Sequence, residues 1–221
     1  MHHLKFLQEI VAKDFKGQFR FFANKMVLST ELAPNLYKSD QLKTAPQLLC
    51  LRKNQRLFQT FKLKTNNLNS KDNFFSNESF KKLCFSSQNS LRDLTLRNAS
   101  QINQNVLLEG IQCFQQLQKL DLSYNADTVT DVFIKDLFDG PNKLKLTSFS
   151  ARCCSKLTST SFAKLILNLG ETLESLDVSG CVLMQNDALC SLRHNKTLKV
   201  LLLEHLRVSN QGLSFLQETS L

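Results

Sequence analysis

The residues of this sequence that could do nucleophilic, redox or metal-binding chemistry are its seven cysteines. A zinc or redox site commonly uses two cysteines that are separated by two residues, and no pair here has that spacing. The odd count also does not suit a framework of disulfides. We therefore predict free thiols in a reducing compartment, with no metal ion. The seven are Cys50, Cys84, Cys113, Cys153, Cys154, Cys181 and Cys190.

The four histidines offer little for acid–base catalysis. His2 and His3 lie at the start of the chain, and His194 lies between a predicted helix and a predicted strand. His205 stands beside Glu204, but an isolated pair of this kind is typical of a solvated surface. The glycine-rich loops that bind phosphates are also missing. We expect no catalytic residue and no cofactor, and we predict that the protein is not an enzyme.

The charge of the chain is divided unevenly. Residues 1–100 carry 17 Lys and Arg against 7 Asp and Glu, whereas residues 101–221 carry 11 against 12. The basic residues form no Arg-rich cluster and no aromatic–basic motif, which disfavours nucleic acid as a partner. No apolar run approaches the roughly 18 residues of a membrane span, and charges interrupt the apolar positions of MHHLKFLQEIVAKDF. We predict an intracellular protein, cytoplasmic or nuclear, that does not cross a membrane.

A nine-residue pattern, L-x-x-L-x-L-x-x-(N/C), occurs six times in this sequence. Successive copies start 33, 26, 29, 27 and 25 residues apart. From the second copy on, each is followed by an apolar residue, then by a polar residue suited to a helix N-cap, then by apolar residues at helical spacing. Each unit is therefore predicted to be strand, turn and helix. The copies are FQTFKLKTN from Phe58, LRDLTLRNA from Leu91, LQKLDLSYN from Leu117, LTSFSARCC from Leu146, LESLDVSGC from Leu173 and LKVLLLEHL from Leu198.

The ninth place of the pattern predicts how the strand turns. Backbone groups at this turn would be buried without partners unless a small polar side chain reached them. Asparagine can donate to nearby carbonyls, and cysteine can do so weakly while packing as a small apolar residue. This structural role competes with a metal or redox site at Cys153 and Cys154 and is favoured over it. Four units have such a residue: Asn66, Asn125, Cys154 and Cys181.

These units resemble the cysteine-containing subclass of leucine-rich repeats, and VSNQGLSFL from Val208 is similar to the helix start of that subclass. The resemblance implies an α/β fold: a leucine-rich repeat solenoid with a parallel sheet on its concave face, helices on its convex face and an N-terminal helical cap. The repeats would cover residues 57–221 in six units, with an insertion around LNSKDNFFSNESF. No polar cap follows the last unit, which leaves open a fragment or a last helix that shields the end.

Residues 1–56 differ in composition and are predicted to form helices near 4–15, from Ser29 and after Pro46. They are either a cap on the first repeat or a docking segment for an adaptor. LKFLQEIVA from Leu4 and VLSTELAPNLYKSDQL from Val27 resemble the helical box of Zyg-type and mitotic-exit-network-antagonist-like ubiquitin-ligase receptors. Gln8 stands at the expected cysteine, Ser29 and Thr30 replace the expected Leu-Pro, and an F-box proper is not recognisable. The resemblance implies that five residues dock the adaptor of a cullin: Leu4, Leu7, Val11, Leu32 and Leu36.

The pleat of each strand places its third, fifth and seventh residues on the concave face. Thr95, Ser123 and Ser179 are expected there, and the face runs from basic in the first unit to acidic and apolar in the last. Such a gradient suits a protein partner of opposite polarity. An outward Leu202 beside Val200 also indicates a partner, a further repeat or self-association. The candidate binding residues are Lys62, Lys64, Arg97, Asp121, Tyr124, Arg152, Asp177, Leu202 and Glu204.

The sequence thus favours a non-catalytic protein-binding module. One hypothesis is the substrate-recognition subunit of a cullin-type ubiquitin ligase. The alternative is a repeat scaffold or regulator with no link to a ligase.

Overall fold

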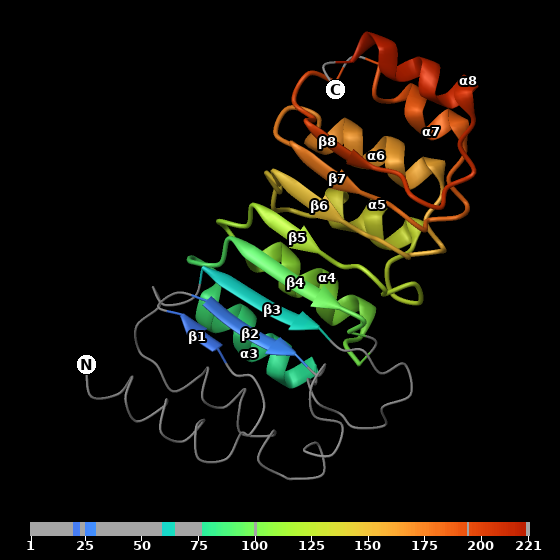
Figure 1. Ribbon diagram of the computed structural model, residues 1–221. Helices are drawn as coiled ribbons and strands as arrows, with labels where there is room; N and C mark the ends of the chain where they lie inside the picture. The colour runs from blue at the N-terminus through green and yellow to red at the C-terminus, as the bar shows by residue number, and fades with distance from the viewer. Residues whose placement is uncertain are drawn as a thin grey trace. The chain divides into compact units, whose positions relative to one another are not determined.

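The structure, a computed structural model, describes residues 20–22, 25–29, 59–64, 77–99, 101–193 and 195–219. The chain forms two compact units, residues 1–116 and 117–221, which are described separately. From residue 60 on, parallel strands alternate with helices along the chain in each unit (Figure 1).

The first unit contains more strands than the sequence analysis predicted. Strand β1 (Arg20–Phe22) pairs antiparallel with β2 (Lys25–Ser29), and β2 pairs parallel with all five residues of β3 (Thr60–Lys64). Strand β3 then pairs parallel with β4 (Asp93–Arg97). Part of the segment 1–56 therefore extends the sheet of the repeats. The helices predicted near 4–15, after Ser29 and after Pro46 lie outside the described residues.

Helix α3 (Asn77–Ser87) lies in the stretch that we had assigned to an insertion, and that assignment was wrong for these residues. Phe80, Leu83, Cys84 and Ser87 are buried. Their spacing of three, four and seven residues places them on one face of a helix. The helix of the first repeat is therefore present, and α4 (Gln104–Cys113) follows β4 as the helix of the second.

The second unit contains four strand–helix repeats. The order is β5 (Lys119–Asp121), α5 (Asp131–Asp139), β6 (Ser148–Ser150), α6 (Ser159–Leu169), β7 (Ser175–Asp177), α7 (Asn186–Cys190), β8 (Val200–Leu202), α8 (Asn210–Leu213) and the 3-10 helix η3 (Ser214–Glu218). The strands pair parallel, and equivalent places of the pattern are direct neighbours in the sheet. This confirms the six predicted strands, two in the first unit and four in the second.

The eighth residue of five repeats has a left-handed backbone. The φ angles are 53° at Asn98, 66° at Tyr124, 59° at Cys153, 75° at Gly180 and 56° at His205. A non-glycine residue rarely adopts this conformation because its Cβ crowds the backbone. Its recurrence at one place of the pattern shows that this bend is what ends the strand and sends the chain toward its helix.

The ninth residue then satisfies backbone carbonyls inside the turn, as predicted. The Asn125 amide Nδ2 donates to the Leu122 carbonyl at 2.8 Å. The Cys154 Sγ donates to that same Leu122 carbonyl at 3.4 Å, and Cys181 Sγ donates to the Ala151 carbonyl at 3.2 Å. Each cysteine therefore reaches back into the preceding repeat. Asn66 lies outside the described residues.

A second set of hydrogen bonds links neighbouring repeats at the helix N-termini. The first residue of each of four helices accepts, through a side-chain oxygen, the N–H of the residue that caps the next helix. These bonds satisfy amides that a helix leaves without partners at its start. The pairs, acceptor first, are Asn77 and Asn103 at 2.7 Å, Asp131 and Thr158 at 2.9 Å, Ser159 and Gln185 at 3.2 Å, and Asn186 and Ser209 at 2.9 Å.

Asp131 is the most heavily used member of this set. Its carboxylate also accepts the Thr158 hydroxyl at 2.6 Å and the Ser161 hydroxyl. Burial alone would raise the pKa of Asp131, but the bonds from Ser161 and Thr158 outweigh burial and hold that pKa below its usual value. The side chain is therefore a carboxylate at neutral pH, as its three donors require.

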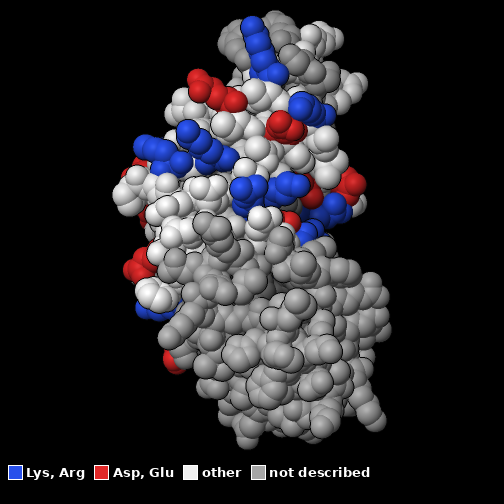
Figure 2. Space-filling view, turned by 90° about the vertical axis from the view of Figure 1, so that its left-hand side faces the viewer, with Lys and Arg blue, Asp and Glu red and all other residues white. Residues whose placement is uncertain are grey.

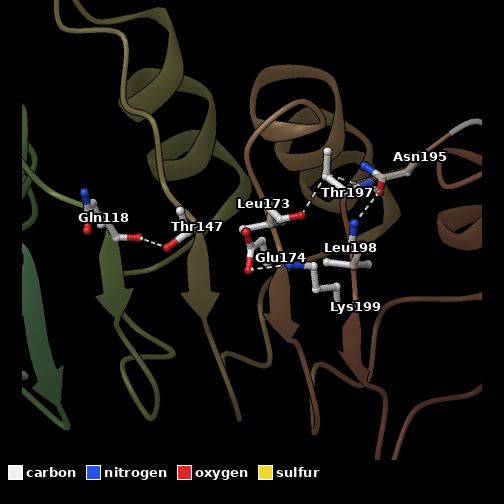
Figure 3. A network of polar contacts seen from close by, with 8 residues as sticks. All are labelled: Gln118, Thr147, Leu173, Glu174, Asn195, Thr197, Leu198 and Lys199. Atoms are coloured by element: carbon white, nitrogen blue, oxygen red, sulfur yellow. Dashed lines mark hydrogen bonds and ion pairs between the residues drawn. The ribbon is translucent and has the colours of Figure 1, made fainter. Parts of the chain in front are cut away.

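A third set of bonds lies where the strands of the second unit begin (Figure 3). Thr147 Oγ1 donates to the Gln118 carbonyl at 3.2 Å, and Thr197 Oγ1 contacts the Leu173 carbonyl at 2.9 Å. Asn195 Oδ1 accepts the N–H of Leu198 at 2.8 Å. The repeats of β6 and β8 are thus also tied to the repeats before them where their strands begin.

We expect Gly180→Ala to lower the free energy of unfolding by about 1–3 kcal/mol, because alanine strains a left-handed position. A Cβ there would also lie 2.8 Å from Cys153 Sγ. Chemical denaturation measures the loss, and the Cys153→Ala background should restore part of it. Gly140→Ala is the control, since φ of Gly140 is −67°. Equal losses at the two glycines would contradict this explanation.

We also expect a stability loss at alkaline pH from the ninth-place cysteines. Burial raises the pKa of Cys154 and of Cys181 from 9.0 to about 12. Above pH 9 the unfolded chain releases these protons while the folded chain retains them. The free energy of unfolding therefore falls between pH 9 and 12, by up to about 1.4 kcal/mol per pH unit for each thiol. The double variant Cys154→Ser, Cys181→Ser keeps the donors and should show a shallower slope; an unchanged slope would count against this origin.

Candidate functional site

The candidate site is the face of the sheet that lies opposite the buried side chains of the second unit. We call it the strand face and define it by the third, fifth, seventh and eighth places of β5 to β8 and the turns after them. The fifth-place residues Asp121, Ser150, Asp177 and Leu202 are neighbours in the sheet. The first three are half-buried, and Leu202 is exposed. Side chains from all four repeats therefore line one row.

We expected the seventh-place serines to face solvent, but the structure buries them. Ser123 and Ser179 are fully buried, and Thr95 in the first unit is 3% exposed. Ser123 Oγ donates to Asp121 Oδ1 at 2.6 Å and lies 2.8 Å from Ser150 Oγ. Ser179 Oγ accepts the N–H of Glu204 at 3.2 Å. The two serines therefore form hydrogen bonds within the protein rather than offering their hydroxyls to a partner.

Asp121 and Asp177 have a structural role in addition to their candidate binding role. Each carboxylate Oδ1 accepts the N–H of the residue two positions later, Ser123 and Ser179, at 3.0 Å in both cases. Aspartate commonly forms this local bond where a strand turns. The repeated D-x-S in the sequence was a usable signal for it. One carboxylate oxygen of each aspartate is therefore engaged in the turn of its own repeat.

The structure brings together two candidate residues that are 52 positions apart in the chain. Arg152 Nη2 lies 2.6 Å from Glu204 Oε2, and the pair spans the intervening repeat over buried Ser179. The bond from Glu204 and its charge, together with the more distant Asp177 and Tyr124, raise the pKa of Arg152 above its usual value. The positive charge predicted at Arg152 is therefore neutralised within the strand face itself.

The two ends of the strand face expose apolar and aromatic groups. Tyr124 has a left-handed backbone, and its side chain is 46% exposed. Its N–H donates to the carbonyl of Arg152, in the turn after β6, at 2.8 Å. On β8, Val200 is 46% exposed and Leu202 is 40% exposed. Aromatic and aliphatic side chains next to charges are typical of protein-binding surfaces.

The predicted basic part of the site, in the first unit, is less basic than the sequence indicated. Lys62 Nζ lies 3.2 Å from Asp93 Oδ2, so the charges of these two side chains on neighbouring strands neutralise each other. Arg97 is half-buried at the end of β4. The side chain of Lys64 lies outside the described residues, as do Leu4, Leu7, Val11, Leu32 and Leu36 of the predicted adaptor-docking segment.

A metal-binding cluster and a membrane-spanning helix are both missing from the described residues. No group of three or more His, Cys, Asp or Glu in the described ranges could hold a metal ion. Among the helices of those ranges, none has the length and apolar character of a membrane span. In the view of Figure 2, Lys and Arg side chains lie interspersed with Asp and Glu on the described surface and form no continuous basic patch.

Comparison with known proteins bears on the fold. No protein-family model matches the sequence, and no curated protein matches it either. Among solved structures, Rad7 in the crystal structure of the Rad7 and Elc1 complex in yeast is similar, with a TM-score of 0.63 and 20% sequence identity. The match covers 80% of this chain and 44% of that chain, so the present chain corresponds to less than half of Rad7.

The chain has a leucine-rich repeat fold. The predicted α/β class is confirmed by the parallel strands that alternate with helices, and the similarity to Rad7 agrees with it. Since the match is in fold alone, the assignment of the strand face as a binding surface rests on its own residues.

We expect the Arg152–Glu204 pair to contribute a small coupling to stability, because its side chains are 31% and 56% exposed. A double-mutant cycle with alanine at both positions should show this coupling in melting temperature at low salt and lose most of it in about 0.5 M NaCl. The Lys199–Glu174 pair is the control: its atoms are 3.1 Å apart and its side chains are 69% and 52% exposed. We expect a smaller coupling there. A coupling at Arg152 that salt does not change would contradict a screened surface pair.

Proposed function

We propose that this protein is a non-catalytic protein-binding module whose strand face holds the partner. The observation that carries the proposal is the composition of that face: exposed Tyr124 follows the strand of Asp121, and exposed Val200 and Leu202 lie on β8 next to Asp177 on β7. Apolar side chains at the core of a surface supply binding energy, and flanking charges supply specificity. The repeat fold holds these groups on a regular sheet.

The charges of the strand face indicate which partner it suits. Arg152 is already paired with Glu204, whereas Asp177 lies beside Leu202 in the sheet. The second unit therefore presents a carboxylate beside an apolar patch. A partner segment with lysine or arginine next to an apolar residue complements this arrangement.

We further propose that the module is the substrate-recognition subunit of a cullin-type ubiquitin ligase. Two observations support this: residues 1–56 resemble the helical box of such receptors, and Rad7, which has a similar fold, was crystallised as a complex with Elc1. The adaptor would dock on Leu4, Leu7, Val11, Leu32 and Leu36. The alternative is a scaffold or regulator without an adaptor, which β2 favours because it joins the same segment to the sheet.

Variants of the strand face test the binding proposal. Asp177→Lys combined with Leu202→Glu should weaken capture of a specific partner by at least about tenfold, since both the charge and the apolar contact are reversed. The matched control is Leu167→Glu on α6, where the side chain is 81% exposed. Partners should be identified by mass spectrometry and their affinities measured with purified components. Equal affinity for both variants would exclude the strand face as the binding site.

The ligase proposal requires point variants rather than a deletion, because removing residues 1–56 would also remove β1 and β2 from the sheet. Elc1 is one concrete probe. We expect the intact chain to bind it, Leu7→Glu with Leu36→Glu to lose binding, and Gln8→Cys to bind more tightly because it restores the residue of the resembled box. Circular dichroism of each variant checks folding. Absence of binding to Elc1 or to another cullin adaptor, with the strand face still active, would favour the scaffold alternative.

A further inference from the structure

Two thiols lie between the helices of the first two repeats. Cys84 is on α3 and is 6% exposed, whereas Cys113 is the last residue of α4 and is half-buried. Neither is in a disulfide. Unlike Cys154 and Cys181, these residues are not at the ninth place of the pattern, so the turn chemistry of the repeat does not account for them.

Gly110 brings the two thiols together. A Cβ at Gly110 would lie 2.3 Å from Phe80 Cε1 and 2.7 Å from Cys84 Sγ, so α3 and α4 approach closely only because this residue has no side chain. Cys113 follows three positions later on the same face of α4, and its Sγ donates to the Gly110 carbonyl at 3.0 Å. Both sulfurs therefore lie beside Gly110.

The two thiols are also close enough to influence each other's ionisation. The Cys113 side chain, together with burial, raises the pKa of Cys84. The Cys84 side chain holds the pKa of Cys113 below its ordinary value. The thiolate is the reactive form of cysteine, so the more exposed thiol is also the one that ionises first. A reactive thiol with a second thiol as its neighbour is the arrangement of a redox-sensitive pair.

We propose that Cys84 and Cys113 are a redox-active pair that hydrogen peroxide converts into a disulfide between α3 and α4. The Cys113 thiolate attacks peroxide, forming the sulfenic acid and releasing hydroxide. The Cys84 thiol then attacks this sulfur and the S–S bond forms. The hydroxyl of the sulfenic acid takes the thiol proton and leaves as water. Peroxide is reduced, and two thiols are oxidised by two electrons. The product covalently joins the first two repeats.

Peptide mapping of the oxidised full chain tests the pair directly. After treatment with hydrogen peroxide and alkylation of remaining thiols, trypsin can cleave at Arg92 and Arg97, between the two cysteines. We expect one linked peptide that contains Cys84 and Cys113 and that dithiothreitol separates. A product in which Cys113 forms sulfinic acid while Cys84 stays alkylatable would overturn the proposal, as would a linkage of either residue to another cysteine.

The order of the two steps is tested by trapping. In Cys84→Ser, the serine hydroxyl takes the place of the thiol beside Cys113, and we expect dimedone to label Cys113 as its sulfenic acid because the second thiol is gone. Cys190 is the internal control, since it is exposed and its side chain is not part of the pair. Cys113 should be labelled about tenfold faster than Cys190. Equal rates would show that Cys113 has no special reactivity and would overturn the proposal.

Cys84 is buried, so Cys84→Ser can lower stability, but the test of the linkage does not depend on that variant. The wild-type peptide map decides the linkage without any substitution, and Cys190→Ser should leave it unchanged. The oxidised wild-type chain should also melt a few degrees higher than the reduced chain, because the bond restricts the unfolded state. Dithiothreitol should reverse this shift. If the linked chain melted at the same temperature as the reduced chain, the idea that the folded chain accommodates this disulfide would be contradicted.

Discussion

The rest of the structure depends on how each repeat satisfies its backbone where the strand turns toward its helix. The carbonyls of Leu122 and Ala151 are inside this turn, where water does not reach them. A left-handed eighth residue makes the bend, and the ninth residue supplies the donor from the same or the following repeat. An unsatisfied buried carbonyl would cost about 1–3 kcal/mol in each repeat. Asn125, Cys154 and Cys181 solve the problem in the same way, and the strands that they follow pair in register, so that equivalent exposed places form rows.

This regularity explains what the strand face offers to a partner. Rows of equivalent places bring residues from distant parts of the chain side by side, as with Arg152 and Glu204. Several charges are then neutralised within the protein or used to complete the turns, as at Asp121 and Asp177. The surface that remains is less charged and more apolar than the sequence suggests. The repeat fold therefore determines which residues the strand face exposes and which of the charges on that face are already paired within the protein.

The cysteines show that one residue type has separate roles in this fold. Cys154 and Cys181 are buried, keep their protons and act as hydrogen-bond donors to the backbone. Cys84 and Cys113 lie off the repeating places, on α3 and α4, with both sulfurs beside Gly110. The first role follows from position within a repeat. The second depends on Gly110, which allows two helices to approach each other more closely than a larger residue would permit.

The sequence by itself determined the α/β repeat fold, the six strands and the role of Asn125, Cys154 and Cys181, because these features are local and recur at a fixed period. It also named most residues of the strand face, since strand pleating follows from spacing alone. The helix α3 was missed because the first repeat departs from the pattern, and β2 was missed because no copy of the pattern marks it. Only the tertiary structure decided which face residues are buried, as Ser123 and Ser179 are, and which charges pair. Burial and pairing depend on the distance between side chains from different repeats, and that distance is set by packing rather than by position in the sequence.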